Sequence, residues 1–178
     1  MITTVEPIST YKQRVAEAIA SIDESEVMAI IGMLRSIRDR GSTIFVVGNG
    51  GSQANAQHLV LHLRDVGIKA IDLMADGAFL TAQSNDFGYK GSAARLLKLL
   101  QRGSDGLLVI SGSGRSDNIL ECLRVGKGTK AGILGFGGGL ALPSCQVAVV
   151  LSQTEYGVVE DAMLVVIHII HESLKNDF

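Results

Sequence analysis

The chain has 178 residues, of which 47% are hydrophobic, 19% are charged and 4% are aromatic, and its formal net charge is −2. That length suits one domain with a substantial core, so we expect residues 1–178 to form a single domain. The near-neutral charge and the lack of tryptophan argue against a basic nucleic-acid-binding surface and a base-stacking platform. We therefore expect neither nucleic acid nor a membrane as a partner.

Hydropathy bears on assembly and compartment. The mean hydropathy of +0.31 is high for a soluble monomer, which predicts apolar surface buried between subunits. The first residues have neither the basic nor the apolar region of a secretory signal, and the apolar stretch 162–170 is shorter than the roughly 20 residues that cross a bilayer. Cys122 and Cys145 form no CxxC motif and are expected to be reduced, buried thiols. We expect a cytoplasmic protein.

The first elements along the chain are helical. Apolar residues recur at helical spacing over 11–22 and 25–39, which predicts an N-terminal helix pair within residues 1–40. Ser21 with Glu24 resembles a capping box between the two helices. The pair carries no detectable chemistry, and we expect it to pack against a neighbouring subunit.

From residue 41 onward, strands alternate with helices. The strands are apolar throughout rather than alternating, as is typical of buried parallel strands. This pattern predicts an α/β fold, a three-layer α/β/α sandwich with a mostly parallel five-stranded sheet over residues 41–178. The expected strands are 42–48, 69–74, 106–111, 129–136 and 146–152, and the expected helices are 52–64, 91–102, 117–125 and 158–174.

Ligands of open α/β sheets bind beyond the carboxyl ends of the strands. The first strand is followed by GNGGS (48–52), whose glycines let backbone N–H groups approach an anion. The third strand is followed by SGSGRSD (111–117), where hydroxyls, glycines and a helix start predict a phosphate cradle; the alternative is a flexible loop. Neither loop fits a dinucleotide or P-loop motif. A third cluster, GFGGG (135–139), is expected to be a close-approach loop without an assigned role.

The histidines fall on two helices. His58 and His62 are four residues apart on one predicted helical face, and Glu160 and His168 lie eight apart near one face of the last helix. His58, His62, Glu160 and His168 are a suitable zinc set in ligand type and number. The alternative is that they are hydrogen-bonded core or interface histidines. His171 has no assigned role, and Asp161 is expected to be structural.

Four sequence blocks occur in the order GNGGSQANAQH, SNDFGY, ISGSGRSDNI and VEDAMLVVIH. Together they resemble the SIS (sugar isomerase) domain family, and the likeness is closest to its phosphoheptose isomerase branch. The resemblance implies a flavodoxin-like sandwich, a homotetramer with sugar-phosphate sites at subunit boundaries, and isomerisation of sedoheptulose 7-phosphate to a heptose phosphate.

The resemblance also implies which residues bind the substrate. Asp86 would bind sugar hydroxyls, although Asn85 and Asp86 also suit a simple turn. Gly112 stands where the family usually carries a threonine, so one hydroxyl contact is missing. The phosphate would be held by Ser111, Ser113 and Ser116 with the backbone of Gly112, and the sugar would be lined by Asn49, Gly50, Gly51 and Ser52.

The catalytic positions depart from the family pattern. Isomerisation through an enediol needs a base and an acid, which the branch supplies with a glutamate and a histidine. His168 matches that histidine, but His62 replaces the glutamate, and Glu160 replaces a glutamine ligand. Some members hold zinc at the matching positions. His62 suits a base unless metal occupies its lone pair, in which case Glu160 would be the base.

Two functions follow from the resemblance. The first is a ketose-phosphate isomerase with His168, His62 and Glu160 as catalytic candidates and zinc as a candidate cofactor. The alternative is a non-catalytic SIS module that binds a sugar phosphate as a regulator or serves as a tetrameric scaffold for a replication initiator protein. The missing glutamate favours the second, and the retained His58 and His168 favour the first.

Overall fold

The chain folds around one sheet whose strands all run parallel, in the order β2-β1-β3-β4-β5. The structure, a computed structural model, describes residues 7–176. This strand order is that of flavodoxin-like folds, so the predicted three-layer sandwich is confirmed. The strands are β1 (Thr43–Val47), β2 (Lys69–Asp72), β3 (Gly106–Ser111), β4 (Thr129–Leu134) and β5 (Val147–Val150).

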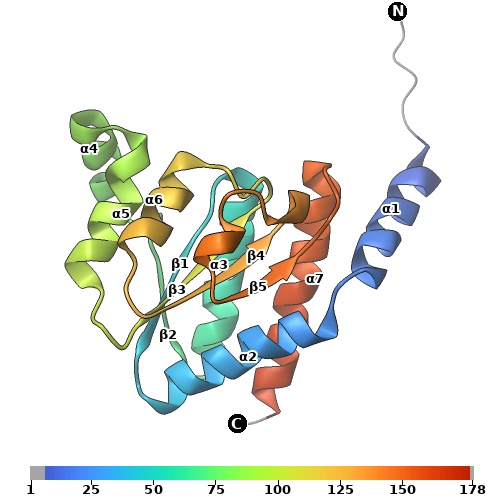
Figure 1. The fold of residues 1–178 in the computed structure, drawn as a ribbon, viewed down its shortest axis with the longest axis horizontal. Coiled ribbons are helices and arrows are strands. Elements are labelled where there is room, and N and C mark those ends of the chain that lie inside the picture. Colours follow the sequence, from blue (N-terminus) through green and yellow to red (C-terminus); the bar gives the residue numbers. More distant parts are fainter. Residues whose placement is uncertain (1–6, 177–178) are drawn as a thin grey trace, which may run out of the picture.

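Helices cover both faces of the sheet (Figure 1). One face packs against α2 (Glu24–Asp39), α3 (Gly50–Asp65) and α7 (Tyr156–Lys175). The other face packs against α5 (Tyr89–Leu100) and α6 (Asp117–Val125). Because both faces are covered, the central strands β1 and β3 are buried almost throughout, which explains their continuous apolar character, whereas the edge strand β2 keeps the exposed Lys69.

Two helices stand outside this core. Helix α1 (Ile8–Ala20) lies beside α7 and contributes only Ala18 to the buried core, whereas α2 fills the same core as α3 and α7. The expected N-terminal pair is therefore divided between an outlying helix and a helix of the sandwich. Helix α4 (Gly77–Phe87) was not predicted, and the structure explains why: it has no buried residue and hence no apolar stripe to recognise.

The expected capping box before α2 is wrong. The N-cap of α2 is Asp23, whose carboxylate accepts hydrogen bonds from the backbone N–H groups of Ser25 and Glu26. Ser21 instead ends α1, where its hydroxyl donates to the carbonyl of Ala18. The short acidic side chain nearest the helix start has taken the capping role.

The topology places the loops after β1 and β3 next to each other. These strands are neighbours, with Val47 opposite Val109, yet their following helices α3 and α6 lie on opposite faces of the sheet. Such a switch point leaves a crevice at the carboxyl ends of the two strands. Within residues 7–176, none of the helices has the length and apolar character needed to span a bilayer.

Candidate functional site

A cavity of about 280 Å³ opens at this switch point. It is small compared with the several hundred Å³ of most ligand sites, and it suits a monosaccharide phosphate better than a dinucleotide. The structure brings the expected residues of both loops to its wall, together with Glu160 and one residue that sequence reasoning missed, Tyr156. The lining residues are Asn49, Gly50, Gly51, Ser52, Ser111, Gly112, Ser113, Ser116, Tyr156 and Glu160.

Three serine hydroxyls around the cavity are oriented by backbone N–H groups. The Oγ of Ser52 accepts from the N–H of Gly112 at 3.2 Å, and the Oγ of Ser111 accepts from the N–H of Gly114 at 3.0 Å. The Oγ of Ser113 accepts from the N–H of Arg115 at 3.2 Å. A hydroxyl that accepts in this way keeps its own proton for donation. The cavity is thus lined with donors suited to an anion.

Three helix N-termini meet at the same place. The first residues of α3 and α7 and the N-cap of α6, Ser116, all line the cavity. The side chains of the three N-cap residues, Asn49, Ser116 and Glu155, make no capping hydrogen bond. The first N–H groups of these helices therefore remain for a ligand, and the helix dipoles favour negative charge there.

The third glycine cluster supports the serine loop. Gly135 N–H donates to the carbonyl of Ser111 at 3.0 Å, and Ala141 N–H donates to the carbonyl of Gly114 at 2.9 Å. A Cβ on Gly114 would lie 2.1 Å from the carbonyl oxygen of Gly138. The two loops approach so closely that only glycine fits, which accounts for the cluster to which the sequence assigned no role.

Asn49 is held by two residues that sequence reasoning did not single out. Its side-chain amide exchanges two hydrogen bonds with that of Asn118, at 2.8 and 2.9 Å, and its Oδ1 also accepts from the hydroxyl of Tyr89 at 2.6 Å. Tyr89 ends the SNDFGY block, so its motif was visible although its role was not. Asp86 of the same block is exposed in the last turn of α4 and is not among the lining residues.

Glu160 faces the glycine loop. Its carboxylate lies against Gly51, where an added Cβ would meet Oε2 at 2.2 Å. Its backbone carbonyl accepts a hydrogen bond from the Nδ2 of Asn55 at 2.9 Å, which ties α7 to α3. Glu160 is the one carboxylate among the lining residues. A proton acceptor thus stands beside the anion-binding loops.

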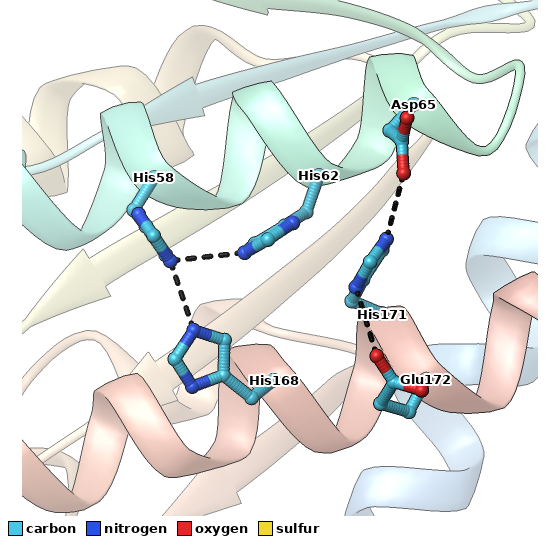
Figure 2. Close-up of polar contacts among 6 residues, drawn as sticks. All are labelled: His58, His62, Asp65, His168, His171 and Glu172. Carbon is cyan, nitrogen blue, oxygen red and sulfur yellow. Dashed lines mark hydrogen bonds and ion pairs between the residues drawn. The ribbon is translucent and has the colours of Figure 1, made fainter.

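The rings of His58, His62 and His168 converge between α3 and α7 (Figure 2). The Nε2 of His58 lies 2.9 Å from the Nε2 of His62 and 2.9 Å from the Nε2 of His168. One nitrogen from each ring falls within 4.8 Å of the others, as a shared metal ion requires. Tetrahedral zinc at about 2.05 Å from each nitrogen would set the nitrogens about 3.4 Å apart, so the two 2.9 Å contacts of His58 need only lengthen slightly. The three histidines fit a metal.

The expected fourth ligand lies elsewhere. Glu160 is not part of the histidine group and is about 12 Å along α7 from His168, given the helical rise per residue. Conversely, none of the three histidines lines the cavity. The stretch from Gly48 to Leu63 therefore contributes to two places in one chain. Its glycine half lines the cavity, and its histidine half supplies His58 and His62 to the histidine cluster.

His171 supports the cluster from behind. Its ring stacks on that of His62 with centroids 4.1 Å apart and planes 27° from parallel. Its Nε2 lies 3.1 Å from Oδ2 of Asp65, and its Nδ1 lies 3.5 Å from Oε1 of Glu172, so carboxylates occupy both nitrogens (Figure 2). Burial, followed by the neighbouring His171, His58 and His168, lowers the pKa of His62. A neutral imidazole is the form that binds metal.

Comparison with known proteins identifies the family. Residues 10–138 match the SIS domain. The phosphoheptose isomerase of Geotalea daltonii is 32% identical over 172 residues, which cover 92% of this chain and 90% of that protein. Another relative, the phosphoheptose isomerase of Chlorobaculum parvum, is 34% identical over 155 residues, which cover 81% of this chain and 74% of that protein.

The fold agrees with this assignment. The structure of a phosphoheptose isomerase from Francisella tularensis superposes with a TM-score of 0.91 at 23% identity and covers 98% of this chain and all of that one. The chain therefore belongs to the SIS domain family, as an enzyme of its phosphoheptose isomerase-like branch.

Proposed function

We propose that this protein isomerises sedoheptulose 7-phosphate, or a near relative, to the aldose phosphate through an enediol. The observation that carries the proposal is the cavity itself. Serine hydroxyls and three helix N-termini converge on a space sized for one sugar phosphate, with the carboxylate of Glu160 on its wall. The names of the relatives support the reaction type.

The groups in the cavity divide the work. Ser111, Ser113 and Ser116 bind the phosphate, and Asn49 to Ser52 line the sugar. Glu160 takes the proton from the carbon beside the carbonyl, because it is the carboxylate that reaches the cavity. Removing that proton while the carbonyl oxygen gains one gives the enediol. Returning a proton to the former carbonyl carbon, while the neighbouring hydroxyl loses its proton, gives the aldose and completes the isomerisation.

The histidines act on the oxygen side of the reaction. His58, His62 and His168 would hold a zinc ion, which would polarise the substrate carbonyl as a Lewis acid. In the absence of metal, His168 transfers the second proton, the one that moves between the substrate oxygens. His62 is then the base next to His168. His168 is exposed, and the large apolar side chains beside the cluster are also exposed, Leu61 at 61% and Ile169 at 41%.

Those exposed side chains support assembly as a homotetramer. Apolar surface next to a polar cluster is typical of a face that a second copy covers. On α1 and α2, Ile8 is 80% exposed and Met28 is 54% exposed, which extends the apolar surface along the N-terminal helices. In such an assembly, the exposed His168 of one subunit reaches the cavity of a neighbour, and the two halves of the motif contribute to a shared site.

The decisive experiment is a turnover assay. We expect purified protein to convert sedoheptulose 7-phosphate into an aldose phosphate, detected by NMR, and to respond to added zinc or chelator. The double variant Ser113→Ala, Ser116→Ala should weaken the binding of phosphorylated ligands at least tenfold more than the binding of neutral sugars. The exposed Ser144, which does not line the cavity, offers the control Ser144→Ala.

One observation favours a second candidate function. Within the described chain no histidine lines the cavity, so a single subunit would bind a sugar phosphate without holding all the catalytic candidates. Saturable binding of the substrate by the assembled protein, with no turnover in the presence or absence of zinc, would refute the proposed reaction on this substrate and favour the regulatory or scaffold module.

A further inference from the structure

Tyr156 occupies the space beside Gly112 in the wall of the cavity. It is the first residue of α7 and is 57% exposed. If Gly112 carried a Cβ, that atom would lie 2.9 Å from Cδ1 and 3.0 Å from Cε1 of the Tyr156 ring. The ring therefore lies directly on the backbone of the serine loop, and a side chain at position 112 would have to displace it.

A second aromatic ring supports Tyr156. The ring of Phe136 packs against it with centroids 4.9 Å apart and planes inclined at 52°. Phe136 has a positive φ of 50°, and its N–H donates to the carbonyl of Gln153 at 3.1 Å. A positive φ is uncommon for a residue with a large side chain, so the loop pays a conformational cost to keep Phe136 in this position. The Tyr156 ring thus has a fixed partner within the fold.

The ring differs in character from the rest of the lining. The other lining groups are glycine backbone, serine hydroxyls, the Asn49 amide and the Glu160 carboxylate. These groups suit a phosphate and sugar hydroxyls, but they offer no apolar surface to the carbon chain that joins them. Ligand sites commonly pair a few polar groups with an aromatic wall for this purpose.

We infer that Tyr156 is a substrate-contacting residue that selects for a carbon skeleton attached to the phosphate, and that Gly112 leaves the room its ring requires. The face of the ring packs against the C–H groups of the sugar next to the phosphate. Inorganic phosphate has no such groups and gains nothing from the ring. This inference rests on the proposed function of the cavity and deepens it.

Calorimetric titration of two probes tests the inference. We expect Tyr156→Ala to weaken the binding of sedoheptulose 7-phosphate about five- to tenfold, because the sugar loses its contact with the face of the ring. The affinity for inorganic phosphate should change less than twofold. Tyr156→Phe keeps the ring and should leave both affinities within twofold of the wild type. Equal weakening of the two probes by Tyr156→Ala, or no weakening of the sugar phosphate, would overturn the inference.

The same titrations separate this inference from the proposed function. A wild-type protein that binds neither probe refutes both. A wild-type protein that binds both probes while Tyr156→Ala has no effect refutes only the role of Tyr156.

The shared space is tested without a ligand. Gly112→Thr should lower the Tm of the wild type, since the new side chain meets the ring, and should lower it less in the Tyr156→Ala background. Equal losses in the two backgrounds would show that the ring does not occupy the space at position 112.

Discussion

The Nε2 atoms of His58 and His168 lie 2.9 Å apart, although 110 positions separate the two residues in the chain. They meet because α3 and α7 pack side by side and run in the same direction. Gly51 lies against Glu160 at the start of the two helices, and Asp65 lies against His171 near their ends. One helix interface thus carries both the carboxylate of the cavity and the histidine cluster.

The cluster predicts metal binding that depends on three histidines and not on the fourth. We expect His58→Ala and His168→Ala each to weaken zinc binding at least about 100-fold at pH 7.5, because each removes a ligand. His171→Gln is the matched control, since carboxylates contact both of its ring nitrogens, and it should lower the zinc affinity less than about tenfold. Zinc titration against a competing chelator measures each value. Similar losses in all three variants would contradict the ligand assignment.

Glu160 should be required for turnover and not for binding. Glu160→Gln is expected to lower kcat by about 100-fold or more, because the amide cannot accept the proton. The same change should tighten the binding of inorganic phosphate about threefold, since it removes a negative charge from an anion site. Asp161→Asn is the control: its carboxylate is exposed and accepts a hydrogen bond from the hydroxyl of Tyr11 at 2.9 Å. An active Glu160→Gln enzyme would refute the role of Glu160 as base.

The lowered pKa of His62 predicts loss of stability on acidification. In the unfolded chain, the His62 ring keeps its proton up to the ordinary pKa of 6.5, whereas in the folded chain the ring releases its proton at a lower pH. Between those values the unfolded state binds more protons, so the free energy of unfolding falls as the pH drops below about 6.5. Above that range the contribution of His62 is constant and fully present.

Thermal unfolding of metal-free protein from pH 7.5 to pH 5 measures this effect. The wild-type Tm should fall more steeply below pH 6.5 than that of His62→Gln, which lacks the titrating ring. Parallel pH profiles for the two proteins would show that His62 titrates alike in the folded and unfolded states.

Two glycines with nearly the same φ distinguish the cost of steric crowding from the cost of a left-handed backbone. Gly114 has φ +60° and an added Cβ would lie 2.1 Å from the carbonyl of Gly138, whereas Gly137 has φ +66° and no neighbour within 4 Å of that position. We expect Gly137→Ala to lower the free energy of unfolding by about 1–2 kcal/mol, the cost of a left-handed conformation. Gly114→Ala should cost about 2 kcal/mol more and weaken phosphate binding, since the serine loop must move. Equal losses in urea unfolding would contradict the close approach.

Much of the fold was predictable from local pattern. Strands β1, β3 and β4 are largely apolar runs that end in or are followed by glycine or serine, and the alternation of strands with helices leaves few topologies to consider. Helix α4 was missed because none of its residues is buried. The glycine cluster at 135–139 was noticed without a role, because its partner is the serine loop more than twenty residues earlier.

The two loops could be recognised in the sequence as candidate anion-binding loops, since serine, glycine and a helix start follow a predicted buried strand. The sequence also placed two histidines on each of two predicted helices, 52–64 and 158–174. Which of these residues meet depends on how the helices pack in three dimensions. Helices α3 and α7 pack in parallel, so the rise along each helix places Glu160 beside Gly51 and places His168 beside His58 and His62. Spacing within one helix indicates a shared face, but the level at which that face meets another helix depends on how the whole core packs.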